Sequence, residues 1–185
     1  MLERACLGDE VARRWIFERH APRVARVLAS LVGGSAEIAD LVQEVFLAGF
    51  QRLDRVEDAS KLGAWLAGIA VNKAHHARRA RRRKWWLSFL PPSDVPPMVS
   101  RGAPLEVRET VRATEAVLAR LDDEERAVLV LRFIEGMTIN EIAVACEVAP
   151  ATVKRRIQRA RGDFVALARE DARLSIWTGG ADEPE

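Results

Sequence analysis

The residues best suited to chemistry lie on a basic segment near the C-terminus, residues 150–164. At helical spacing its apolar side chains fall on one face, at Val153, Ile157, Ala160 and Phe164. The opposite face then carries Lys154, Arg155, Gln158 and Arg159. Cations with an amide among them bind phosphates and base edges. The pattern therefore predicts a nucleic-acid contact, although charge runs of this kind also occur on solvated helices of ordinary bundles.

The elements around this segment predict a helix-turn-helix over residues 121–161. Gly136 suits the end of one helix, and Thr138 followed three residues later by Glu141 has the form of a capping box. A short helix with one apolar face follows, with Ile139, Ile142, Ala143 and Cys146 at spacings of three and four. A turn then leads into the basic helix. This order of elements positions a second helix to enter a DNA groove.

A second basic run lies at the C-terminal end of a helix that we predict to start at Ser60 or Lys61. Its inward face carries Leu62, Trp65, Leu66, Ile69 and Ala70, and its end carries Arg78, Arg79, Arg81, Arg82, Arg83 and Lys84. Like charges this close repel, so we expect the run to fray unless an anion lies against it. The following Trp85 and Trp86 either pack against the domain or stack on bases, and packing is the better prediction because exposed tryptophans are costly. His75 and His76 are adjacent on this helix and do not converge, so we expect a solvated or DNA-facing role and no metal site.

The length, composition and charge of the chain exclude several classes of protein. The chain has 185 residues, of which 49% are hydrophobic and 30% charged, and its formal net charge is only +2. Cys6 and Cys146 are the only cysteines and no Cys/His pairing is present, so we expect reduced thiols and no zinc. No secretory signal or membrane span is evident, which predicts a cytoplasmic protein. Nothing assembles a nucleophile, a base and an orienting group, so we expect no enzyme activity and no cofactor.

Helical periodicity predicts an all-α protein of two small domains joined by a flexible proline-rich linker. The expected ranges are residues 1–89, a linker over 90–106, a second domain over 107–170 and a tail over 171–185. In the first domain we expect helices over residues 11–31, ended by Gly33 and Gly34, and over 36–53, capped by Ser35. In the second, Val107, Val111, Leu118 and Leu121 mark the apolar face of another helix.

The helix predicted over residues 36–53 has an unusual outer face. Its apolar stripe runs from Ile38 to Leu53, and the opposite face shows Asp40, Gln43, Glu44 and Leu47. A solvated face would explain the polar groups. An exposed leucine beside two acids instead indicates a surface for a partner protein.

Two separated segments together resemble the bacterial sigma factors. Residues 39–47 (A-D-L-V-Q-E-V-F-L), with Ala64-Trp65-Leu66 and Ile69-Ala70-Val71-Asn72, resemble their N-terminal core domain. Leu131-Arg132-Phe133, Glu135-Gly136-Met137-Thr138, Glu141-Ile142-Ala143, Thr152-Val153-Lys154 and Arg159-Ala160-Arg161 resemble their C-terminal helix-turn-helix domain. With only these two domains and a short linker, the chain is similar to the extracytoplasmic-function (group 4) sigma factors over residues 11–168.

The resemblance implies partners for each face. Asp40, Gln43, Glu44 and Leu47 would contact the clamp helices of the largest RNA polymerase subunit, and the polymerase flap would be a further contact. Promoter DNA would be read at the minus-ten element by Lys61, Asn72, His76, Arg79, Arg82 and Arg83. The minus-thirty-five element would be read by Thr152, Lys154, Arg155, Gln158 and Arg159. The family also implies an anti-sigma factor, which could hold the protein at the inner membrane.

Two positions and one loop depart from the family pattern. Ala149 stands where a serine usually caps the recognition helix, and Glu147 stands at a turn position usually held by glycine. Residues 55–61 lack the aromatic side chains common in the base-capturing loop.

Two rival interpretations stay open at this stage. One is an autonomous helix-turn-helix transcription regulator, which would bind promoter DNA tightly without polymerase. The other is a helical adaptor or anti-sigma-like protein, whose basic runs would contact acidic protein surfaces.

Overall fold

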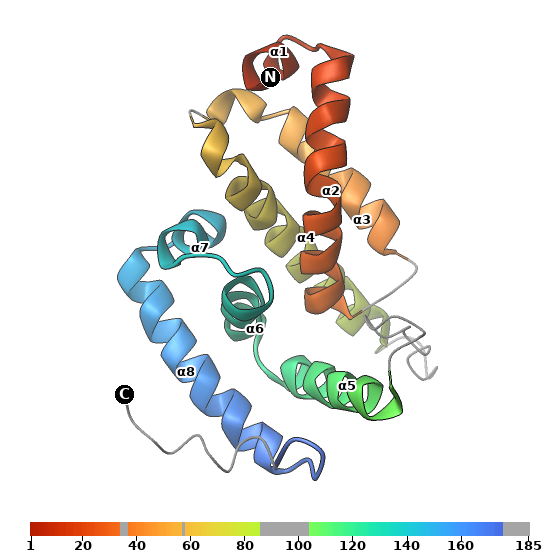
Figure 1. Ribbon diagram of the computed structural model, residues 1–185, viewed down its shortest axis with the longest axis vertical. Helices are drawn as coiled ribbons and strands as arrows, with labels where there is room; N and C mark the ends of the chain where they lie inside the picture. The colour runs from red at the N-terminus through yellow and green to blue at the C-terminus, as the bar shows by residue number, and fades with distance from the viewer. Residues whose placement is uncertain (34–36, 57, 86–103, 176–185) are drawn as a thin grey trace.

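The chain folds into two helical bundles that lie against each other (Figure 1). The computed structural model describes residues 1–33, 37–56, 58–85 and 104–175, and of residues 82–85 it describes the backbone alone. Within these residues every regular element is helical, which confirms the all-α prediction. Residues 90–103 of the predicted linker 90–106 lie outside the described residues, whereas Leu105 and Glu106 already belong to the first helix of the second bundle.

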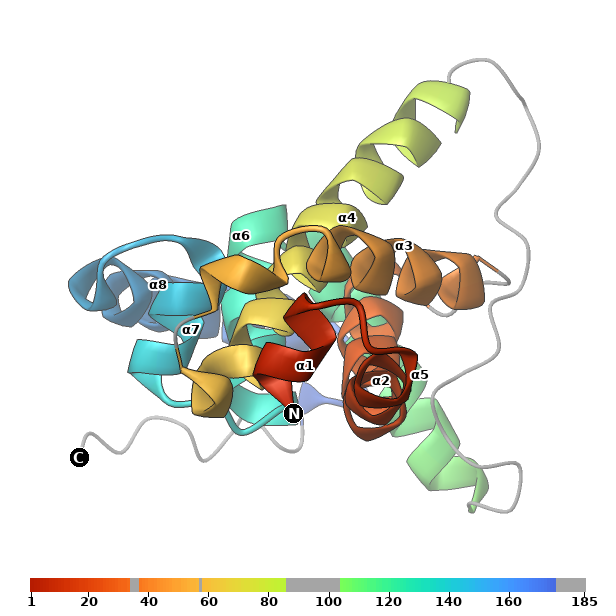
Figure 2. The ribbon, with the colours of Figure 1, turned by 90° about the horizontal axis from the view of Figure 1, so that it is seen from above.

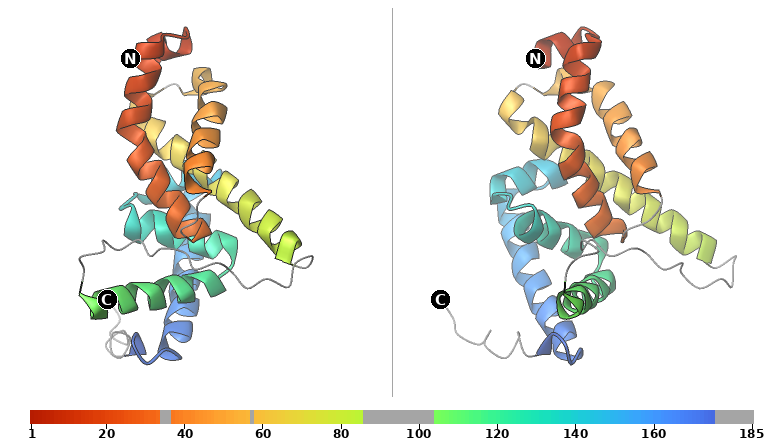
Figure 3. Two further views of the ribbon diagram at one scale, coloured as in Figure 1. Left: turned by 90° about the vertical axis from the view of Figure 1, so that its right-hand side faces the viewer. Right: turned by 45° about the vertical axis from the view of Figure 1, so that its right-hand side comes forward.

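The N-terminal bundle consists of α1 (Leu2–Cys6), α2 (Glu10–Val32), α3 (Ile38–Phe50) and α4 (Leu62–Trp85), with short 3-10 turns at Leu53–Arg55 and Ala59–Lys61. Asp9 caps α2 by accepting hydrogen bonds from the amides of Val11 and Ala12, and Gly33 ends it with φ of 72°. Helices α2, α3 and α4 pack pairwise around a core that includes Ile16, Leu28 and Val45. Figure 3 shows α2 and α3 lying along α4.

Two predicted helices differ from those in the structure. The helix expected over residues 36–53 is shorter, because Leu53 turns into a 3-10 segment while its side chain stays buried; Ser35 lies outside the described residues. Val107, expected on an inward face, is 47% exposed. The buried face of its helix is formed by Ala113, Val117 and Leu118.

The C-terminal bundle consists of α5 (Leu105–Arg120), α6 (Asp123–Leu129), a π-helical turn at Val130–Ile134, α7 (Ile139–Cys146) and α8 (Pro150–Arg169). Capping boxes start α6 and α7, formed by Asp122 with Glu125 and by Thr138 with Glu141. The second box confirms the predicted start of the short helix. Gly136, with φ of 64°, lies between the π turn and α7.

The two bundles share one apolar core. Buried side chains from α2 and α4 form a continuous cluster with those from α6, α7 and α8. The main contact joins α4 to α7, as Figure 2 shows from above, and a second one brings the end of α2 against α6 and the π turn. The surfaces predicted for DNA binding are therefore placed relative to each other by direct packing.

Candidate nucleic-acid and polymerase interfaces

Helix α8 packs against the core with its apolar face, as the spacing of its apolar residues predicts. Val153 and Ala160 are fully buried, and Ile157 and Phe164 are half-buried against the same core. Pro150 occupies the first helical position, and Ala149 makes no side-chain cap hydrogen bond. This seating leaves the opposite face to solvent.

The outer face of α8 presents most of the predicted DNA-reading side chains. Lys154, Arg155 and Gln158 are exposed, and Thr152 is half-buried. Arg159 is also exposed, but its Nε lies 3.0 Å from the Glu125 carboxylate and 3.7 Å from that of Asp163. At helical spacing Arg155 and Gln158 are the outermost long polar side chains, which suits them to reach base edges.

A basic groove flanks this face and was not predicted from the sequence. It has a volume of about 800 Å³, and its cationic lining comes from Arg132, Lys154, Arg161 and Arg169. Lys154 and Arg161 are seven residues apart and so share one flank of α8, a spacing that the sequence already contains. The groove extends the positive surface beside Gln158 towards the π turn.

The turn before α8 carries the one non-glycine residue with positive φ among those the structure describes. Glu147 has φ of 54° and ψ of 41°, the left-handed conformation expected if this position takes over the role of glycine. The backbone amides of Glu147 and Val148 donate hydrogen bonds to carbonyl oxygens of α7. These carbonyl groups at the end of α7 therefore have partners, despite the strained conformation of Glu147.

Helix α4 carries the predicted minus-ten residues along one face. Asn72, His76 and Arg79 are exposed on α4, and Lys61 is exposed in the turn before it. Arg82 and Arg83 continue the same helix, but their side chains lie outside the description. Asn72 and His76 line a cavity of about 390 Å³ whose other wall is α7, with Val144, Ala145 and Glu147.

Two residues of α4 are not where the sequence interpretation placed them. His75, expected to be solvated or DNA-facing, has its Nε2 3.1 Å from the carbonyl oxygen of Asp123. Arg78, expected in an open basic track, lies with its Nε 3.0 Å from the Asp123 carboxylate. Arg81 pairs with Glu37 at 3.0 Å. Anions do therefore lie against the basic run, and the protein itself supplies them.

The predicted polymerase-binding residues share one exposed face of α3. Asp40, Gln43, Glu44 and Leu47 are all exposed, and Leu47 keeps 64% of its surface in solvent. Lys73 of α4 donates a 2.8 Å hydrogen bond to Glu44. The face therefore combines an apolar centre with acidic neighbours, as protein interfaces often do.

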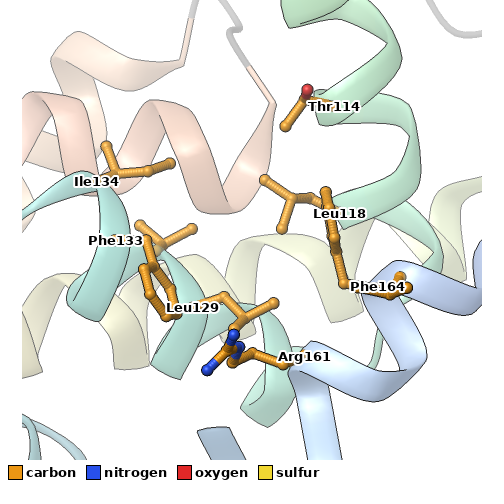
Figure 4. Close-up of a pocket in the computed structure, with 9 residues that line it drawn as sticks. Thr114, Leu118, Leu129, Phe133, Ile134, Arg161 and Phe164 are labelled. Carbon is orange, nitrogen blue, oxygen red and sulfur yellow. The ribbon is translucent and has the colours of Figure 1, made fainter. Parts of the chain in front are cut away.

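An apolar groove lies between α5, the π turn and α8. It has a volume of about 260 Å³, and Figure 4 shows Leu118, Leu129, Phe133 and Phe164 lining it, with Arg161 at its edge. Phe133 and Ile134 keep 60% and 45% of their surfaces exposed. Large apolar side chains left exposed together mark a site for a protein partner.

Neither cysteine belongs to a metal site in the described part of the chain, where no group of three or more suitable ligands gathers. Burial raises the pKa of the Cys146 thiol to about 11. This thiol therefore stays protonated and unreactive at neutral pH. Cys6 is exposed on α1.

Comparison with known proteins matches both halves of the chain to one family. The profile "Sigma-70 region 2" matches residues 16–84, and "Sigma-70, region 4" matches residues 112–163. The sigma factor NccH of Alcaligenes xylosoxydans xylosoxydans is 30% identical over 175 residues, which cover 90% of this chain and 92% of the relative. The extracytoplasmic-function sigma-E factor of Escherichia coli K12 is 29% identical over 170 residues, covering 87% and 88%. The chain belongs to the extracytoplasmic-function sigma factors.

Solved structures agree with this membership in the sigma factors. The sigma factor RpoE of Bartonella quintana, solved with the anti-sigma factor NepR, matches with a TM-score of 0.65 and 25% identity over 85% of this chain and 97% of that one. CnrH, solved with the cytosolic domain of CnrY, matches with a TM-score of 0.68 and 25% identity over 92% and 96%. This protein is thus an alternative sigma factor that directs transcription initiation. No described helix meets the length and hydropathy needed to cross a membrane.

Proposed function

We propose that this sigma factor divides its work among three surfaces. The α3 face with Asp40, Gln43, Glu44 and Leu47 binds the clamp helices of the largest polymerase subunit. The α4 face with Lys61, Asn72, His76, Arg79, Arg82 and Arg83 reads and melts the minus-ten element. The α8 face with Thr152, Lys154, Arg155, Gln158 and Arg159 reads the minus-thirty-five element. The observation that carries the proposal is that the polar groups of α3 and of α8 each lie on one exposed face, opposite a buried one.

The chemistry of each DNA-reading face suits its target. A duplex groove is read by long donors such as Arg155 and Gln158, which form bidentate contacts with base edges. Melted DNA is a single strand, and its recognition needs a cationic path with stacking or hydrogen-bonding groups. Trp65, Asn72 and His76 supply such groups on α4. Tethering two modest contacts to one polymerase raises their effective concentration and so gives specificity.

We assign the apolar groove beside Phe133 and Ile134 to the polymerase flap. The groove lies beside Arg161, which also lines the basic groove, so one domain would contact polymerase and DNA together. In this proposal all the named surfaces bind partners, and none of them catalyses a reaction.

An anti-sigma factor is the regulator that we propose. Support comes from two structural relatives, of which RpoE was solved with an anti-sigma factor and CnrH with the cytosolic domain of CnrY. The site of action would be the cytoplasm, and a membrane-attached anti-sigma factor would hold the protein at the inner membrane.

A comparison of two double variants tests the division of labour. Arg155→Ala with Gln158→Ala removes two groups that reach the groove, so we expect altered use of minus-thirty-five sequences and unchanged affinity for polymerase core. Asp40→Ala with Gln43→Ala should weaken core binding and leave DNA preference unchanged. Core affinity is measured by fluorescence anisotropy and promoter preference by transcription in vitro. Equal losses of core affinity from both pairs would contradict the assignment.

A further inference from the structure

The basic groove beside α8 combines cations with apolar side chains, and no acid of the described residues lines it. Its apolar lining comes from Phe133, Ile139, Ile157, Val165 and Ala166. Among its cations, Lys154 and Arg161 form no ion pair within the part of the chain that the structure describes. The groove therefore suits an acidic ligand that also carries apolar side chains.

The described acids at the end of α8 have partners outside this groove. Glu170 lies 2.6 Å from Arg120 of α5, and Asp171 lies 2.7 Å from Arg173. Neither arginine lines the groove. These acids therefore leave the cations of the groove to another anion.

The C-terminal tail, residues 176–185, has a composition complementary to the groove. Ile176 and Trp177 are its large apolar residues, and its acids follow at Asp182, Glu183 and Glu185. The tail contains no lysine or arginine, so its side chains carry only negative charge. These residues lie outside the described part of the chain, and their sequence alone shows that they match the groove in both charge and apolar content.

The last described residues place the start of this tail beside one end of the groove. Leu174 is buried against Ala168 of α8 and Val117 of α5. Arg169, the next residue of α8 after Ala168, is also the last residue that lines the groove. The chain therefore leaves the second domain next to the end of the groove that Arg169 marks.

The tail is also long enough to follow the groove along α8. At the rise of a helix, Arg169 and Lys154 are about 22 Å apart. An extended chain spans up to about 24 Å from Ser175 to Asp182 and up to about 34 Å from Ser175 to Glu185. The acids can therefore reach the cations from Arg169 to Lys154, while the two apolar residues stay near the start of the groove.

We propose that the tail, residues 176–185, binds in the basic groove and competes there with minus-thirty-five DNA. This inference rests on the proposed function, because it takes α8 to be the helix that reads this element. Carboxylates of the tail then occupy Lys154 and Arg161, which phosphates of DNA would otherwise contact. Because the tail belongs to the same chain, its effective concentration at the groove is high, and a promoter gains the same advantage only when polymerase holds it.

Carbodiimide coupling of the full-length protein, without DNA or polymerase, tests the position of the tail. The reagent joins carboxylates to amines in contact with them, and Lys154 is the one lysine in the second domain of this sequence. Mass spectrometry of the monomer fraction should find Lys154 joined to Asp182, Glu183 or Glu185. Lys154→Arg is the matched control, because it keeps the cation and removes the amine. An excess of minus-thirty-five duplex should reduce the coupling.

Affinity for the same duplex, measured by fluorescence anisotropy, tests the competition. A tail variant with Asp182→Asn, Glu183→Gln and Glu185→Gln should bind about fivefold more tightly than the unchanged protein, as expected for a few screened surface pairs.

A control variant removes three exposed acids from α1 and the half of α2 that lies away from α8 in Figure 1, with Glu3→Gln, Glu10→Gln and Glu18→Gln. Its affinity should change by less than about twofold, because salt screens charges that far from the groove.

Coupling of the tail only to Lys61, Lys73 or Lys84, or to no lysine, would overturn the proposal. Coupling to Lys154 that is confined to dimers would assign the groove to the tail of a second copy, and would overturn it as well. So would equal DNA affinities of the tail variant and its control. Failure to start transcription with polymerase core would instead count against the proposed function, because the coupling needs neither DNA nor polymerase.

Discussion

Arg126 is the residue whose replacement tests the packing of this fold most sharply. Its guanidinium is buried, with 4% of the residue exposed, and donates to three carbonyl oxygens. Two belong to the end of α5 and the residue after it, Leu118 at 2.5 Å and Leu121 at 3.3 Å, and the third is Leu31 near the end of α2. One cation therefore donates to carbonyl groups at the ends of helices from both domains, although the Leu31 carbonyl also accepts a hydrogen bond from Arg78 at 3.3 Å.

The variant Arg126→Met keeps most of the apolar stem and removes every donor. A buried acceptor left without a donor costs about 1–3 kcal/mol, and water reaches some of these carbonyls after the change. We therefore expect a loss of about 3 kcal/mol in the free energy of unfolding, a large share of the ~5–15 kcal/mol typical of a folded domain.

Urea denaturation followed by circular dichroism at constant pH measures this loss. Arg132→Met is the matched control, because Arg132 is exposed and its one hydrogen bond of this kind goes to the Met137 carbonyl at 2.9 Å. The control should lose no more than about 1 kcal/mol. If Arg126→Met unfolds at the same urea concentration as Arg132→Met, the three carbonyl contacts do not stabilise the fold as argued.

Further predictions concern the helix ends and the cysteines. Glu147→Gly should stabilise the protein by about 1 kcal/mol, because a left-handed conformation costs non-glycine residues about that much; a loss of stability in a thermal melt would argue against strain there. Ala149→Ser should add about 1 kcal/mol without altering promoter choice, and Thr138→Ala should remove about 1 kcal/mol, both measured by urea denaturation. With a pKa of about 11, roughly a thousandth of Cys146 is ionised at pH 8, so mass spectrometry should find iodoacetamide on Cys6 well before Cys146; equal rates would contradict its burial.

Local sequence patterns predicted the helix ends and the inner faces. The capping box of Thr138 with Glu141 and the glycine end of α2 depend on residues a few positions apart, so they can be recognised without knowledge of the fold. The same holds for the seating of Val153 and Ala160, because helical periodicity alone determines which side chains share a face.

Contacts between the domains could not be predicted in the same way. The sequence around Arg78 and His75 shows only their neighbours on α4, but their partner Asp123 is 45 or more positions away. The close approach of Gly68 to Ala145 likewise depends on how α7 crosses α4. The π turn at Val130–Ile134 could not be predicted for a different reason. The apolar run around it is nearly continuous, so it has no periodicity that would distinguish a π turn from a regular helix.

Transcription in vitro from a library of promoters, with polymerase core and the full-length protein, tests the central claim most directly. We expect transcripts only when core and protein are both present, from promoters that share a minus-thirty-five and a minus-ten sequence. The protein alone should bind the same promoter duplexes weakly. Tight sequence-specific binding without core, together with no transcription when core is added, would contradict the account and favour an autonomous regulator.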